Sequence, residues 1–388
     1  MDPILTEAHE MLRDAVRDFT RTHCPPAEVR RWDAEGKFPL HVYDALAADG
    51  YLGIGVDEEF GGSGGDIISQ AVVYQELARA MQGSAQLWMN TSCFGAQSVG
   101  AYGTPEQKAK FLPAICEGKV HFAISITEPG GGTDVLGHMQ TQARQVEGGW
   151  LVNGRKVFST GVDYADYILL VTRSLPVDSV AKKSEGITVF LCPAKDPNVT
   201  LRLMPMLGYN TFHSYEVTYD NVFIPDELVL GEPHTGWRHL LHTLNNERIL
   251  SACFSLGCAQ AALDDAIAYA KVREAFGKPI GAFQAVAHHV ANMAIAVDQA
   301  RLLIHRAAWL QSKGQRCGME CTMAKCVAAE AASYCSDLGI QVLGGSGISM
   351  ATDMQRYWRD SRVMRIGPVS NEMARNYIAM ELGLPRNY

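Results

Sequence analysis

Long apolar runs are missing from this sequence of 388 residues, and no uncharged apolar stretch reaches the ~18 residues that a membrane-spanning helix needs. Long blocks of Lys and Arg are also missing, and the formal charge is −8, which argues against nucleic acid as a partner. The sequence contains neither an HExxH motif nor a CxxC pair, so we expect no metal site. We expect the ten cysteines to be reduced, buried thiols.

The first residues, MDPILTEAHEMLRDAV, carry acids and helical periodicity. They lack the basic, then apolar, then small-residue order of a signal peptide. We therefore expect a cytoplasmic protein without membrane attachment. With 47% hydrophobic and 20% charged residues, the composition is that of an ordinary globular protein. At roughly 150 residues per domain, the length predicts two or three domains.

Three kinds of pattern follow one another along the chain. Up to about residue 115, apolar residues recur at helical spacing, as Leu12, Val16 and Phe19 do. Short β-branched runs broken by turn signals come next, and helical periodicity returns after Gly236. This order predicts an α+β protein and excludes an alternating βαβ dinucleotide fold. The predicted domains are an N-terminal helical domain at 1–118, a middle β-barrel or sandwich at 119–230 and a C-terminal helical bundle at 231–388.

The individual elements can be predicted with the same signals. Thr6 is a candidate N-cap of the first helix, and the Gly-rich run at 61–65 is expected to be a loop. The predicted strands are His121–Thr127, Trp150–Phe158, Tyr167–Thr172, Ile187–Leu191, Thr200–Met204 and Tyr215–Ile224. The predicted C-terminal helices are Leu240–Glu274, Gln284–Gly314, Cys321–Leu343 and Asn371–Leu382.

The segment from Ile126 to Asp134, ITEPGGGTD, joins the helical part to the strands. A hydroxyl residue, a proline turn and three glycines bring backbone N–H groups close to whatever lies there, which suits anionic or carbonyl oxygens. On these residues alone, a simple Gly-rich connection is an equally open interpretation.

This segment resembles the TEPGxGSD signature of the acyl-CoA dehydrogenase family of flavoproteins. Four further motifs of that family follow in the family's order. They are Asn153–Thr160 (NGxKxWIT), Arg273–Gln284 (RxxFGxxIxxFQ), Gln341–Gly347 (QxxGGxG) and Tyr357–Val363 (YRDARV). The resemblance covers the chain from about residue 5 to residue 385, and five ordered matches are far more specific than any one of them.

The resemblance implies a helical N-terminal domain, a middle β-domain and a C-terminal four-helix bundle. It also implies non-covalently held FAD and a homotetramer, because in this family a neighbouring subunit completes each FAD site. The implied FAD contacts are Ile126, Thr127, Thr133, Phe158, Ser159, Thr160, Arg273, Phe276, Gln284, Gln341, Gly344, Gly345, Ser370 and Glu372. A guanidinium such as that of Arg273 can bind two pyrophosphate oxygens at once, although a surface or interface salt bridge is the alternative for that residue.

The chemistry of the family needs a carboxylate base with a raised pKa. Leu240, Leu244 and Glu247 fall at i, i+4 and i+7, so the carboxylate shares a helix face with leucines. Desolvation on such a face raises the pKa of an acid. By resemblance, Glu247 is the catalytic base at the helix position that isovaleryl-CoA dehydrogenase and similar members use. The alternative for Glu247 is an ion pair with a neighbouring helix. Thr133, Asn245 and Arg248 are the implied substrate-binding residues.

Pro368 stands where many members carry their base in a C-terminal turn. Proline cannot act as a base, and it lacks the N–H that polarises the thioester oxygen at this turn. The implied function is dehydrogenation of an acyl-CoA, with electrons passed to an electron-transfer flavoprotein. The alternatives are an enoyl-CoA reductase, a dehydrogenase or flavin oxidase acting on an acyl-carrier-protein thioester, and a non-catalytic protein on the same fold.

Overall fold

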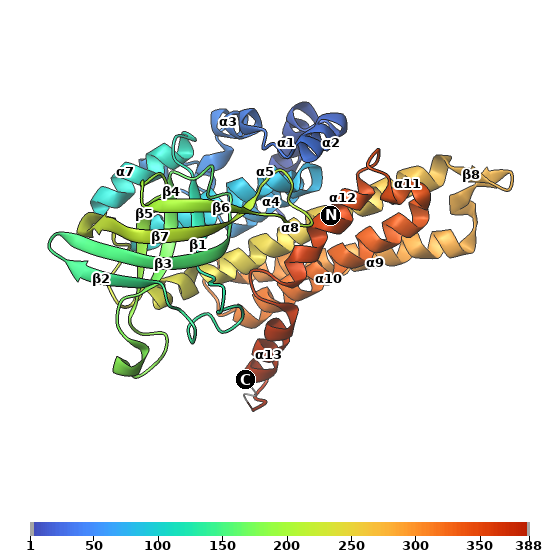
Figure 1. Ribbon diagram of the computed structural model, residues 1–388. Coiled ribbons are helices and arrows are strands. Elements are labelled where there is room, and N and C mark those ends of the chain that lie inside the picture. Colours follow the sequence, from blue (N-terminus) through green and yellow to red (C-terminus); the bar gives the residue numbers. More distant parts are fainter. Residues whose placement is uncertain (1–3, 386–388) are drawn as a thin grey trace.

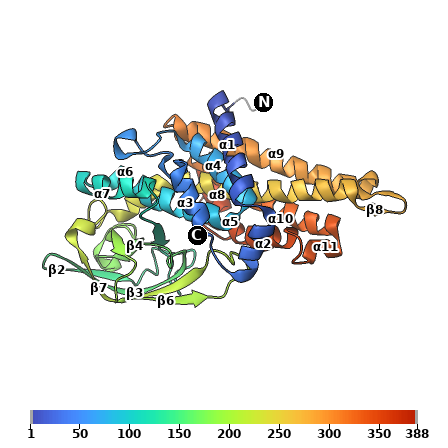
Figure 2. The same ribbon diagram turned by 90° about the horizontal axis from the view of Figure 1, so that it is seen from above.

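The computed structural model describes residues 4–385, apart from the side chains of residues 84 and 242. Helices come first, a β-sheet follows, and long helices complete the chain, as the sequence predicts (Figure 1). The sheet lies at one end of an elongated molecule, and the long C-terminal helices extend away from it to the other end (Figure 1, Figure 2).

The N-terminal part is helical because its caps and apolar spacing agree. Thr6 caps the first helix, and its side chain and that of His9 bond each other's backbone N–H groups. The first helix ends just before the Pro25-Pro26 pair, and Pro26 starts a second helix, where its missing N–H costs nothing. The helices here are α1 (Glu7–His23), α2 (Pro26–Glu35), α3 (Leu40–Ala48), α4 (Ile67–Ala80), α5 (Gln82–Met89), the π-helix η3 (Asn90–Gln97), α6 (Ser98–Tyr102) and α7 (Pro105–Cys116).

The middle part forms one sheet of seven strands in the order β1-β4-β2-β3-β7-β6, with β5 paired to β4. The six predicted strands are present, and β2 is a seventh that the sequence analysis missed. Its burial is mixed because it is short and half solvated. The strands are β1 (Phe122–Ser125), β2 (Gln142–Val146), β3 (Gly149–Thr160), β4 (Tyr167–Arg173), β5 (Ile187–Pro193), β6 (Val199–Met204) and β7 (Ser214–Pro225).

The C-terminal part is built on α8, a helix of 37 residues whose central turns are buried against α4, α9 and α10. A hairpin of β8 (Glu274–Ala275) and β9 (Lys278–Pro279) joins α8 to α9 at the end of the molecule farthest from the sheet (Figure 1). The remaining helices are α8 (Gly236–Val272), α9 (Gln284–Ser312), α10 (Gly318–Leu343), α11 (Gly345–Ile348), α12 (Met354–Ser361) and α13 (Asn371–Glu381).

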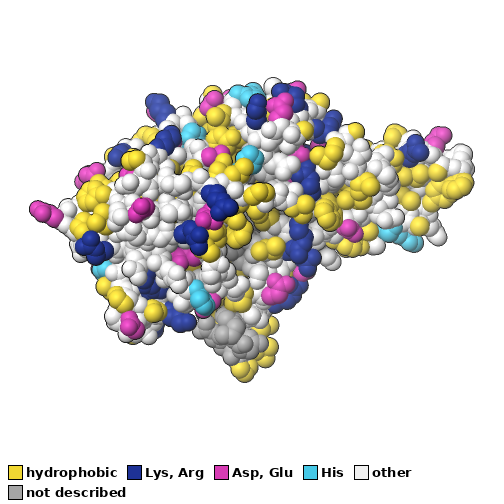
Figure 3. Space-filling view, viewed as in Figure 1, with side chains coloured by type: hydrophobic (Ala, Val, Ile, Leu, Met, Phe, Trp, Pro, Cys, Tyr) yellow, Lys and Arg dark blue, Asp and Glu magenta, His cyan; other side chains and the backbone are white. Residues whose placement is uncertain are grey.

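Apolar side chains are exposed at the tip that this hairpin forms. Phe276 is 95% exposed and Val272 is 76% exposed, and Ile348 and Met350 of the neighbouring segment are also open. Figure 3 shows hydrophobic side chains gathered along this arm of the molecule. An apolar patch of this kind on a folded protein marks a surface that another molecule covers.

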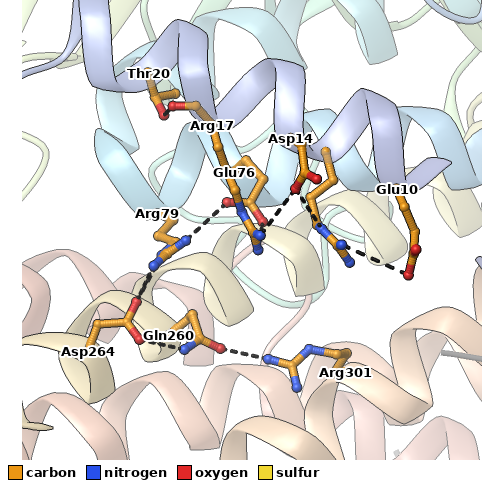
Figure 4. Close-up of polar contacts among 10 residues, drawn as sticks. Glu10, Asp14, Arg17, Thr20, Glu76, Arg79, Gln260, Asp264 and Arg301 are labelled. Atoms are coloured by element: carbon orange, nitrogen blue, oxygen red, sulfur yellow. Dashed lines mark hydrogen bonds and ion pairs between the residues drawn. The ribbon is translucent and has the colours of Figure 1, made fainter. Parts of the chain in front are cut away.

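Paired charges join the N-terminal helices to the long C-terminal helices. Arg17 of α1 donates to the buried carboxylate of Glu76 on α4 (2.9 Å), and Arg79 of α4 donates to Asp264 on α8 (Nε to Oδ2, 2.9 Å) (Figure 4). The same network continues to α9 and borders a cavity of about 600 Å³. These charges neutralise one another. We therefore infer that they join the two helical parts and do not bind a ligand.

No helix within residues 4–385 has both the length and the apolarity to cross a membrane. Among the described side chains, no three His, Cys, Asp or Glu residues gather as metal ligands would. The ten cysteines are all buried and none is in a disulfide.

Candidate active site

Glu247 lies in the first half of α8, where the sequence predicts a desolvated carboxylate. Burial raises the pKa of Glu247 to about 7, while the positive charges of Arg248 and Lys325 act in the opposite direction. Part of the side chain remains accessible to solvent. The carboxylate is therefore enclosed enough to hold a proton near neutral pH and open enough to reach a substrate.

Two polar neighbours of Glu247 on α8, Asn245 and Arg248, are held by the surrounding helices. Arg248 donates to the side-chain oxygen of Asn245 (3.3 Å), and its guanidinium lies over the ring of Tyr377 on α13, 5.4 Å from the centroid. Asn245 in turn donates to Gln311 at the end of α9 (3.4 Å). Both predicted substrate contacts on this helix therefore have fixed directions, whereas Thr133 lies on an exposed loop.

The π-helix η3 connects the carboxylate to the sheet. Asn90 donates to the carbonyl oxygen of Thr160 at the end of β3 (3.0 Å). Three residues later, burial and the nearby Glu247 carboxylate raise the pKa of the Cys93 thiol. One short, buried segment thus borders both Glu247 and the end of β3, and π-helical turns are frequent at functional sites.

The Gly-rich segment after β1 is attached to β3 by a buried ion pair. Lys156 is fully buried and donates to the carbonyl oxygen of Ile126 and to Glu128 (both 2.9 Å). Burial lowers the pKa of Lys156 to about 8. Burial also opposes ionisation of Glu128, but the ammonium and backbone N–H groups outweigh it and lower the pKa of that carboxyl. The backbone of Thr127 is held too, because its carbonyl accepts from Val157 N (2.8 Å).

Phe158 is the most unusual residue of the sheet. Its φ is +57°, its ring is 55% exposed, and the pairing of β3 with β7 shifts register at this point. A non-glycine residue rarely adopts this backbone region, and such outliers cluster at binding sites. The next two hydroxyls point elsewhere: Ser159 shares a hydrogen bond with Ser125 in the core (2.6 Å) and Thr160 with Ser214 (2.8 Å).

The other predicted cofactor contacts lie at the distant tip. Arg273 ends α8, Phe276 lies at the hairpin turn with a φ of +52°, and Gln284 begins α9. Gln341, Gly344 and Gly345 lie at the junction of α10 and α11, at the same end of the molecule (Figure 1). The 26 residues of α8 from Glu247 to Arg273 span about 39 Å. Within a single chain, the predicted FAD contacts at the tip are therefore far from Glu247.

Ser370 and Glu372 lie at the start of α13, after the Pro368 turn. The Ser370 hydroxyl caps this helix by accepting from Met373 N (3.2 Å), and Glu372 is exposed. Between them, Asn371 is buried against Lys325 of α10 (3.0 Å). The sequence analysis missed Lys325, although a single charge in an Ala-rich, otherwise apolar helix face was a signal that could have found it.

Matches to known families divide the chain into the same three parts. The N-terminal, middle and C-terminal domains of acyl-CoA dehydrogenases match residues 6–119, 123–222 and 234–383, respectively. The chain therefore belongs to the acyl-CoA dehydrogenase family, which confirms the predicted family and fold. It is an oxidoreductase of the acyl-CoA dehydrogenase type and a flavoprotein whose cofactor is FAD.

Individual relatives cover almost the whole chain. It is 33% identical to the probable acyl-CoA dehydrogenase YngJ of Bacillus subtilis, over 97% of this chain and 98% of that protein. It is also 33% identical to the caffeyl-CoA reductase-Etf complex subunit CarC of Acetobacterium woodii, over 93% and 94%. The butyryl-CoA dehydrogenase of Megasphaera elsdenii has a structure similar to this one, with 30% identity, a TM-score of 0.93 and 99% and 100% coverage.

The described residues fit FAD at two separate places. Near the sheet, the exposed ring of Phe158 lies beside a segment in which no atom comes within 4 Å of a Cβ built on Gly130 or Gly132. At the tip, the space beside Gly344 is equally open, and the exposed guanidinium of Arg273 offers donors of the kind that bind pyrophosphate. The place near the sheet suits the flat flavin ring, and the place at the tip suits the charged pyrophosphate.

Proposed function

We propose that this protein catalyses α,β-dehydrogenation of an acyl-CoA thioester, with Glu247 as the base. The observation that carries the proposal is the Glu247 carboxylate on α8, whose pKa burial raises to about 7. A base works best when its pKa lies near the working pH. The names of two relatives, one a dehydrogenase and one a reductase of CoA thioesters, support the same class of substrate.

In the proposed reaction, ionised Glu247 removes a proton from the carbon next to the thioester carbonyl. Arg248 binds the substrate side of the site, with its guanidinium oriented by Asn245 and Tyr377. When bound, FAD supplies the acceptor for the hydride of the neighbouring carbon. Phe158 and the end of β3 would border the cofactor, and the buried residues of η3 would limit the access of water to the carboxylate.

We further propose that a neighbouring subunit completes each FAD site, in a homotetramer. The proposal is supported by the rise of about 39 Å along α8 from Glu247 to Arg273 and by the exposed apolar tip around Phe276. In this arrangement the tip of one subunit covers the pyrophosphate and adenosine end of the FAD whose ring lies beside Phe158 of the next.

Replacing Arg273 by Ala is expected to weaken FAD binding at least about tenfold, because charge-assisted hydrogen bonds to the pyrophosphate are lost. Fluorescence titration of the apoprotein with FAD measures the dissociation constant. Arg306→Ala is the matched control, since this exposed arginine of α9 pairs with Glu320 (3.4 Å) and lies outside the predicted contacts. An unchanged FAD affinity in Arg273→Ala contradicts its assignment to the pyrophosphate.

The rate of flavin reduction by substrate is expected to rise with pH, with a midpoint at about 7. The base acts only when ionised, and burial raises the pKa of Glu247 to about 7. At one unit below the midpoint, about a tenth of the plateau rate should remain. Stopped-flow absorbance under anaerobic conditions between about pH 5 and pH 9 (about two units on either side of the midpoint) measures this profile, and a flat profile across that range argues against Glu247 as the base.

The substrate is identified by adding a panel of saturated acyl-CoAs to the anaerobic, FAD-loaded protein. Bleaching of the oxidised flavin band by one class of acyl-CoA establishes the dehydrogenase and names that class. Transfer of the electrons to an electron-transfer flavoprotein is part of the proposal, and the name of the CarC relative supports such a partner.

An enoyl-CoA reductase is the second candidate, and the name of the CarC relative, a caffeyl-CoA reductase subunit, supports it. Pro368 does not separate the two directions, because the backbone N–H that proline lacks would polarise the thioester oxygen in both. Oxidation of the chemically reduced protein by enoyl-CoAs, in the absence of bleaching by any saturated acyl-CoA, decides for the reductase.

A further inference from the structure

A buried lysine on α10 holds the segment that contains Pro368. Lys325 is 1% exposed, and its ammonium donates to the carbonyl oxygen of Val369 and to the side-chain oxygen of Asn371 (3.0 Å). Val369 directly follows Pro368, whose nitrogen has no hydrogen to donate. The segment is therefore fixed to α10 through its carbonyl group and through Asn371.

Asn371 strengthens the attachment from the other side. Its amide nitrogen donates to the carbonyl oxygen of Cys326 and to Glu330 on α10 (both 3.4 Å). Glu330 also pairs with Arg375 one turn further along α13. Because Asn371 is itself buried, the start of α13 and the turn before it have a single defined position against α10.

The same ammonium is one of two positive charges that act on Glu247. The charges facing that carboxylate are Arg248 on its own helix and Lys325 from α10, with the Cys93 thiol on η3. Arg248 already contacts Asn245 and Tyr377. Lys325 is therefore the positive charge that acts on Glu247 from α10, the helix packed against α8.

The groups around Lys325 favour its charged form. Burial lowers the pKa of Lys325 to about 8, while the Cys326 thiol and the carboxylates of Glu372, Glu247 and Glu330 raise it. Near neutral pH the lysine is thus protonated while Glu247 begins to ionise. Each of the two charges then favours the charged form of the other group.

We propose that Lys325 is a positioning residue of the active site, which anchors the Pro368 turn to α10 and favours the ionised form of Glu247. The inference rests on the proposed role of Glu247 as the base and adds to it the residue that adjusts its protonation. In a member of the family whose turn carries no carboxylate, this lysine links the turn to the base on α8.

The test compares Lys325→Met with Lys325→Gln in the full-length, FAD-loaded protein. The first variant removes both the charge and the donor, and the second removes the charge but keeps an N–H donor for the Val369 carbonyl. Infrared difference spectra recorded during a pH titration give the midpoint of Glu247, whose carboxyl band is identified by its loss in Glu247→Gln. Hydrogen exchange measured by mass spectrometry follows residues 366–371.

In both variants the Glu247 midpoint is expected to move upward by about one unit, since an opposite charge has been removed. The pH profile of flavin reduction should move by the same amount, so that the rate is restored at high pH. Hydrogen exchange in residues 366–371 should increase at least about tenfold in Lys325→Met and much less in Lys325→Gln.

An unchanged Glu247 midpoint in both variants overturns the electrostatic part of the proposal, and unchanged exchange in Lys325→Met overturns the anchoring part. A rate that falls equally at every pH, with no shift of the midpoint, also overturns it, because that is the result of a purely structural role. The infrared and exchange measurements need no substrate. If no acyl-CoA bleaches the flavin, that result contradicts only the proposed function. The infrared and exchange measurements still test the role of Lys325.

Discussion

Glu247→Gln is expected to slow flavin reduction by the best acyl-CoA at least about 1000-fold, since positioned general bases contribute about 10²- to 10⁴-fold. The amide keeps the size and shape of the carboxylate but cannot take a proton. It is also neutral, so burying it on α8 costs no more than burying the acid did. The FAD content and thermal stability should therefore match those of the unchanged protein. Anaerobic stopped-flow absorbance measures the rate.

Asp265→Asn is the matched control for this prediction. Asp265 lies further along α8, and burial raises its pKa to about 6, so it shares the helix and the desolvation of Glu247. Its neighbours are Tyr357 and Asp353, at the far side of the long helices. We expect flavin reduction in Asp265→Asn to stay within a few-fold of normal. Normal turnover in Glu247→Gln refutes its assignment as the base.

Lys156→Met is expected to lower the free energy of unfolding by about 3 kcal/mol, the lower end of the range for breaking a buried ion pair. The substitution leaves the carboxylate of Glu128 buried without its ammonium partner. The cost stays at the lower end because Glu128 still accepts from the backbone N–H groups of Gln140 (2.6 Å) and Thr141 (2.9 Å). Chemical denaturation followed by far-UV circular dichroism measures the change.

The control is Lys119→Met, which removes an ion pair of similar length at the surface. Lys119 and Glu117 lie 2.6 Å apart, but both side chains are mostly exposed, and such pairs contribute little. In Lys156→Met we also expect faster release of FAD, because the same ammonium holds the carbonyl group of Ile126. Equal stability of the two variants contradicts the view that Lys156 fixes the Gly-rich segment to β3.

The order of helices and strands could be predicted because local signals agree with the fold. The cap at Thr6 and the loop at 61–65 depend on neighbouring residues only, and both are confirmed. Besides β2, the helix α2 and the π-helix η3 were missed for physical reasons. The helix α2 follows directly on a proline pair that also ends α1. The π-helix η3 is defined by burial among other elements, which a sequence does not display.

The sequence allowed only part of the candidate site to be predicted. Glu247 could be found because an acid on an apolar helix face is visible in the spacing of the sequence. Lys325 and the pair Lys156–Glu128 could not be assigned roles, since their partners lie 28 to 46 residues away in sequence. The roles of the predicted cofactor and substrate residues, and the domain limits at 118 and 230, remain predictions.

The exposed tip around Phe276 has a consequence for how the cofactor is gained and lost. If two different subunits hold the ring and the pyrophosphate of one FAD, the binding of FAD and the association of subunits are coupled by mass action. Dilution then separates the subunits and removes the contacts that the tip of one subunit makes with the FAD of the next. The amount of bound FAD per subunit then measures how far the subunits are associated, and excess FAD favours the associated form.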